Sequence, residues 1–125
     1  MHQQRWFDGS CASVGEARSF TRAALGTQLD PEVVDDLVLA LSELASNAVL
    51  HARTPFGVAV DTESRVRIEV EDGSPVAPRP RPLAVEAETG RGLAIVERVC
   101  DRWGVDVLHG HKCVWCELDV GGHPG

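Results

Sequence analysis

The chain has 125 residues and a formal net charge of −7, with 43% hydrophobic and 25% charged residues. The length fits one globular domain over residues 1–125, with its core over about 5–120, and the composition excludes a disordered chain. The acidic balance argues against a nucleic-acid binder, because phosphate contacts need clustered positive charge. The sequence has neither a secretion signal nor an apolar run of membrane-spanning length, and its four cysteines are too irregularly spaced for a disulfide framework. We therefore expect a cytoplasmic protein with reduced thiols.

Helical and strand patterns share the chain. Hydrophobic periodicity, helix caps and turn residues predict, in order, an edge strand at 5–7, helices at 13–25 and 31–51, strands at 58–60 and 66–70, a helix at 92–100, and strands at 105–108 and 114–120. Four prolines at 75–82 exclude helix and central strand there and predict an extended loop. This mixture predicts an α+β two-layer sandwich, in which about three helices cover one face of a mostly antiparallel sheet.

Three polar residues recur along one side of the second predicted helix. Glu43, Asn47 and His51 are four residues apart, so they stack along that side. A carboxylate there can accept a proton from an attacking water or hydroxyl, and a carboxamide oxygen can ligate Mg²⁺. The same three residues are also typical of a solvent-exposed polar helix face. Alone, they do not distinguish such a face from a catalytic or Mg²⁺-binding site.

Two further motifs follow in the chain. Asp72-Gly73 closes a predicted strand, where the carboxylate can accept a hydrogen bond in a cleft or form an ordinary Asp-Gly turn. Gly90-Arg91-Gly92 precedes a predicted helix, where bare backbone N–H groups can bind phosphate. A flexible loop leading into a helix has the same composition.

The order and spacing of these motifs resemble the histidine-kinase-like ATPase superfamily. The match is closest to its stand-alone anti-sigma-factor serine/threonine kinases of the RsbW/SpoIIAB type. The resemblance runs from about Arg5 to Leu118, and its motifs are Leu41-Ser42-Glu43-Leu44, Asn47-Ala48, His51-Ala52, Asp72-Gly73, Gly90-Arg91-Gly92-Leu93, Asp101-Arg102-Trp103-Gly104 and Val114-Trp115.

The resemblance implies a role for each motif residue. Glu43 is expected to be the general base that activates an acceptor serine, and Asn47 to hold Mg²⁺ across the phosphates of ATP. Asp72, followed by Gly73, is expected to accept the adenine amino group. The phosphates are expected at the second glycine motif, which consists of Gly90, Arg91 and Gly92. Arg91 either adds positive charge there or points to solvent.

The implied function is that of an ATP- and Mg²⁺-dependent kinase in a bacterial partner switch. It would bind a sigma factor, phosphorylate an anti-anti-sigma protein and form a homodimer. Ser74-Pro75, the short proline-rich lid at 76–89 and Cys113, which replaces a small hydroxyl residue near the phosphates, all depart from the family pattern. These departures leave open an alternative, a non-catalytic protein-binding module that keeps the fold with weak or no nucleotide binding.

A third hypothesis is a metal or thiol sensor in the segment 109–116, which contains the histidines and cysteines His109, His111, Cys113 and Cys116. Strand alternation argues against it, because Cys113 and Cys116 should then point to opposite faces of the sheet. Cys116 should lie in the core.

Overall fold

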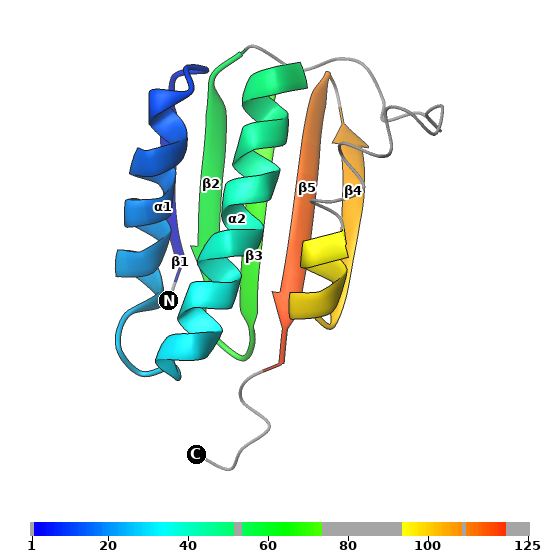
Figure 1. Cartoon of the computed structure of the whole chain (residues 1–125). Coiled ribbons are helices and arrows are strands. Elements are labelled where there is room, and N and C mark those ends of the chain that lie inside the picture. Colours follow the sequence, from blue (N-terminus) through cyan, green and yellow to red (C-terminus); the bar gives the residue numbers. More distant parts are fainter. Residues whose placement is uncertain (1, 52–53, 74–93, 109, 120–125) are drawn as a thin grey trace.

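The computed structural model describes residues 2–51, 54–73, 94–108 and 110–119 (Figure 1). Its strands and long helices follow one another as β1 (His2–Phe7), α1 (Ala12–Leu25), α2 (Pro31–His51), β2 (Phe56–Asp61), β3 (Val66–Asp72), β4 (Arg102–Leu108) and β5 (His111–Leu118). A short helix at 94–99 precedes β4. Within the described ranges, none of the helices is both long and apolar enough to cross a membrane.

The five strands form one sheet in the order β1-β2-β3-β5-β4, and every neighbouring pair is antiparallel. The helices lie on one face of this sheet, and the other face carries no helix of the described residues (Figure 1). The predicted α+β sandwich is confirmed. We call the two sides of the sheet the helix face and the open face.

The core lies between α2 and the helix face. The predicted apolar stripe of α2 is buried throughout, and it consists of Val34, Leu37, Val38, Leu41, Leu44, Ala45 and Ala48. In β3 the alternation is strict, so Val66, Ile68 and Val70 are buried against the helices while Arg67 and Glu69 lie on the open face. Burial of these two apolar sets against each other is the main force that holds the layers together.

Helix boundaries agree with the prediction more closely than strand boundaries do. Helix α1 ends where expected, before Gly26, whose φ of 75° favours glycine. Strand β1 begins at His2 and β4 at Arg102, each three residues before its predicted start. Backbone hydrogen bonds to β2 and β5 extend both strands over residues that lack an apolar alternation, because backbone pairing does not require one.

Candidate functional site

Helix α2 carries the first predicted site residues. Glu43 and Asn47 are half-buried, one turn apart, on a helix that packs against β2 and β3. Their neighbours Leu44 and Ala48 are buried, so the polar pair borders the core. The arrangement provides a carboxylate and a carboxamide on one side of the helix, and these two groups can accept a proton and ligate a hard cation.

Asp72 ends β3 on the helix face. Its side chain is only 2% exposed, because it continues the inward alternation that begins at Val66. The backbone N–H of Gly73 donates to Thr54 Oγ1 at 3.1 Å, which ties the end of β3 to the segment that follows α2. The end of α2, the end of β3 and the start of β5 lie at the same end of the sheet (Figure 1).

Lys112 is a site residue that the sequence analysis missed. It is the register partner of Asp72 across β3 and β5, its side chain is 16% exposed, and its Nζ lies 3.7 Å from Asp72 Oδ2. The signal was available in the alternation of β5, where Val114, Cys116 and Leu118 pack toward the core and Lys112 has the same parity. Lys112 therefore adds a positive charge beside Asp72 on a strand face that is otherwise apolar or cysteine.

Cys113 does not lie where the family pattern led us to expect it. It is on the open face, with its Sγ 3.9 Å from Glu69 Oε1, and burial raises the pKa of its thiol to about 12. The pleat of β5 is the reason, because adjacent residues of a strand point to opposite faces. Lys112, and not Cys113, is the residue of β5 that lies on the helix face beside Asp72. The replacement of a hydroxyl residue by Cys113 therefore does not change the side chains on the helix face.

The same strand pleat separates the residues of the proposed metal or thiol sensor onto two faces of the sheet. His111 lies on the open face, where its Nδ1 is 3.5 Å from Glu71 Oε2, whereas Cys116 is buried on the helix face. The predicted separation of Cys113 and Cys116 is confirmed. Among the described residues, no group of three or more histidine, cysteine, aspartate or glutamate side chains is arranged to hold a metal ion.

The second glycine motif, Gly90 to Gly92 with Arg91 between them, lies outside the described residues, as do Ser74-Pro75 and the segment 76–89. Among the described residues, the contact expected for the adenine base can be examined at Asp72 and Lys112, which lie at one end of the sheet. The Asp72 carboxylate is a strong hydrogen-bond acceptor at this end of the sheet. The exocyclic amino group of adenine is a hydrogen-bond donor, so the chemistry of Asp72 is compatible with the base of ATP.

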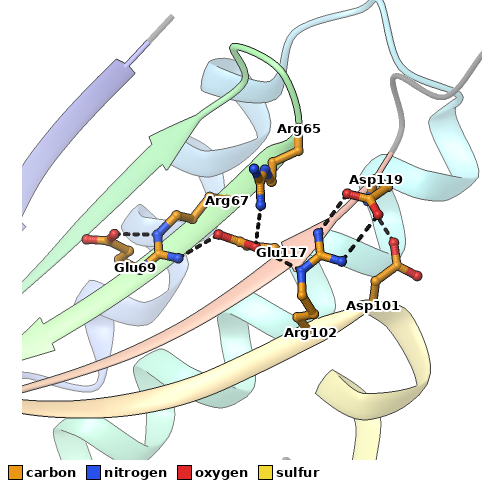
Figure 2. A network of polar contacts seen from close by, with 7 residues as sticks. All are labelled: Arg65, Arg67, Glu69, Asp101, Arg102, Glu117 and Asp119. Carbon is orange, nitrogen blue, oxygen red and sulfur yellow. Dashed lines mark hydrogen bonds and ion pairs between the residues drawn. The ribbon is translucent and has the colours of Figure 1, made fainter.

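A separate charged cluster lies on the open face (Figure 2). Glu117, whose side chain is 10% exposed, accepts hydrogen bonds from Arg67 at 2.6 Å, Arg65 at 2.9 Å and Arg102 at 3.1 Å. The bond from Arg67 contributes most, and with the other two it lowers the pKa of Glu117 to about 2. Arg102 also pairs with Asp119 at 2.7 Å. This Glu117 network joins β3, β5 and β4 on the side away from the candidate site.

Comparison with known proteins identifies the class of domain that this fold and site define. Residues 7–116 match the model of the family described as "Histidine kinase-like ATPase domain". The match covers most of the chain, and the chain belongs to this family. Membership of an ATPase-domain family supports ATP binding.

Two individual proteins resemble the chain over different extents. It is 40% identical over 53 residues to the "Uncharacterized protein SCO4941" of Streptomyces coelicolor, and the match covers 41% of this chain and half of that protein. The fold resembles the crystal structure of the RsbU and RsbW domains of Rv1364c from Mycobacterium tuberculosis, with a TM-score of 0.70 and 20% identity over 94% of this chain. This match spans 32% of the mycobacterial chain. At this identity the second likeness shows the fold alone.

Proposed function

We propose that the protein is an ATP-binding regulator that acts as a serine/threonine kinase on an anti-anti-sigma antagonist and holds a sigma factor inactive by binding it. The observation that carries the proposal is the buried Asp72 carboxylate at the end of β3, at the same end of the sheet as the C-terminal end of α2, the helix that bears Glu43 and Asn47. Family membership supports the nucleotide, and the fold shared with the RsbU and RsbW domains of Rv1364c supports the regulatory role.

In this proposal each polar residue has one task. Asp72 accepts a hydrogen bond from the adenine amino group, Asn47 ligates Mg²⁺ through its amide oxygen, and Glu43 takes the proton from the acceptor serine hydroxyl. ATP with Mg²⁺ supplies the phosphoryl group. Phosphoryl transfer depends mainly on positioning and on neutralising charge, so a helix-borne base and a rigid strand end suit it.

The remaining assignments complete the proposal. Gly73 gives the chain room beside the base, and Gly90 and Gly92 would wrap the phosphates with Arg91 between them. The net charge of −7 favours a protein partner with a basic or mixed surface. A cytoplasmic location and a homodimer belong to the same proposal.

Calorimetric titration with ATP, with and without Mg²⁺, tests nucleotide binding. Binding that strengthens with Mg²⁺ supports the Asn47 assignment, and no binding contradicts the proposal. The catalytic step is tested with Glu43→Ala and a serine-bearing antagonist protein. We expect the variant to bind ATP normally and to lose phosphoryl transfer by at least about a hundredfold. The matched control is Glu32→Ala, in the first turn of the same helix. Transfer that persists in Glu43→Ala would refute the general-base role.

A second candidate is a non-catalytic module that binds a protein partner and retains the fold. The Lys112 ammonium 3.7 Å from Asp72 favours it, because a carboxylate with a charged partner in the protein has less need of a ligand amino group. The same titration separates the two candidates. A module of this kind binds its partner equally well with and without ATP, whereas the kinase requires ATP to modify its antagonist.

A further inference from the structure

The pairing of Asp72 with Lys112 is unusual for its place in the fold. Asp72 is the one charged residue on the helix face of β3, and Lys112, the only lysine in the sequence, is the one charged residue on the helix face of β5. Both side chains are largely buried, at 2% and 16% exposure. Every other position on the helix face of these two strands is apolar or cysteine.

Structural stabilisation alone explains this pair poorly. Two buried charges lose much of their hydration, and the loss is recovered only when their contact geometry is very good. The Nζ–Oδ2 distance of 3.7 Å is too long for a hydrogen bond. The Lys112 ammonium has three donors, and at this distance none of them makes a hydrogen bond to Asp72 Oδ2, so Lys112 keeps donors for a ligand. The geometry therefore suits a donor and an acceptor that are held side by side for a third molecule.

We propose that Asp72 and Lys112 together read the Watson–Crick edge of adenine, with Asp72 accepting from the N6 amino group and Lys112 donating to N1. This inference rests on the proposed function, which assigns Asp72 to the amino group. The two partners are neighbours across β3 and β5, as N6 and N1 are neighbours on the base. Guanine presents the reverse pattern, with an acceptor at position 6 and a donor at N1. The same pair therefore rejects guanine at both positions.

The decisive ligand is 1-deaza-ATP, in which a C–H group replaces N1 and every other contact of ATP is kept. Calorimetry on the wild-type chain should show ATP binding about tenfold more tightly than 1-deaza-ATP, since a hydrogen bond from a charged donor is lost. GTP should bind at least about tenfold more weakly than ATP. These measurements need no variant, so a failure of Lys112→Met to fold would leave the inference testable.

Lys112→Met removes the donor and retains an unbranched side chain. We expect it to bind ATP and 1-deaza-ATP with nearly equal affinity, and Lys112→Arg to keep a preference for ATP. The control is Arg22→Met, which removes a positive charge from the exposed Arg22–Asp35 pair on α1 and α2 and should leave the ratio unchanged. Thermal melts check that each variant is folded.

The outcomes separate this inference from the proposed function. Equal wild-type affinities for ATP and 1-deaza-ATP would overturn the inference and leave ATP binding intact. A preference that survives in folded Lys112→Met would overturn it as well, because another group must then read N1. GTP binding as tightly as ATP would have the same meaning. If neither ATP nor its analogue binds, the proposed function fails and the inference fails with it.

Discussion

Replacing Glu117 by glutamine removes the negative charge shared by three arginines on the open face (Figure 2). The shape of the side chain is kept, but glutamine offers one acceptor oxygen where the carboxylate offers two. The arginines, which come from the turn before β3, from β3 and from β4, would then repel one another without a common partner. We expect the free energy of unfolding to fall while the fold is retained.

The magnitude can be worked from the pKa of Glu117. A shift from the ordinary value of 4.5 to about 2 corresponds to about 3 kcal/mol of interaction between the carboxylate and its surroundings. Arg65 and Arg102 are 47% and 43% exposed, so solvent screens part of this interaction. We expect a loss of about 2 kcal/mol at pH 7 for Glu117→Gln, mostly from the better-shielded Arg67.

The pH dependence provides a second, independent readout. The pKa of Glu117 is lowered in the folded state, so its contribution to stability is complete above about pH 4.5 and is lost as the pH falls toward 2. The difference between the wild type and Glu117→Gln should therefore shrink to about half at pH 3. Urea unfolding followed by tryptophan fluorescence at pH 7 and pH 3 measures both quantities.

The control is Asp35→Asn, which removes the acceptor of Arg22 from a pair whose side chains are 52% and 65% exposed. An exposed pair contributes about 0–1 kcal/mol, so this variant should be nearly as stable as the wild type. If Glu117→Gln costs no more than Asp35→Asn, or if its effect is the same at pH 3 and pH 7, our reasoning about the Glu117 network is wrong.

Two further predictions concern the base site and the packing of the open face. Asp72→Asn should weaken ATP binding by about 1–3 kcal/mol in calorimetry, because the amino group loses a charged acceptor, and an unchanged affinity would place the base elsewhere. Gly104→Ala should lower stability by about 1–3 kcal/mol in urea unfolding, since a Cβ there would lie 2.6 Å from Cζ2 of Trp115. Gly15→Ala is the contrast, because a Cβ meets nothing within 4 Å in this helix position and should stabilise by about 0.5–1 kcal/mol. Equal effects of the two glycine changes would contradict the steric argument.

Local patterns in the sequence predicted the helices and the two faces of the sheet. The start of α2 at Pro31 and its apolar stripe follow from side-chain chemistry within a few residues, and so does the alternation of β3. The opposite orientation of Cys113 and Cys116 follows from the two-residue period of a strand. The motif order from Glu43 to Gly92 predicted the family, which the match over residues 7–116 confirms.

Only the tertiary structure decided which strands pair when they are far apart in the chain, namely β1 with β2 and β3 with β5. Strand β5 lies between β3 and β4, and this order sets Lys112 against Asp72 and brings arginines 65, 67 and 102 to Glu117. The residues of β3 and β5 that meet in this way are far apart in the chain, so no local period relates them. Their pairing depends on the register of the whole sheet, and the register is determined by the simultaneous burial of the apolar helix face of every strand.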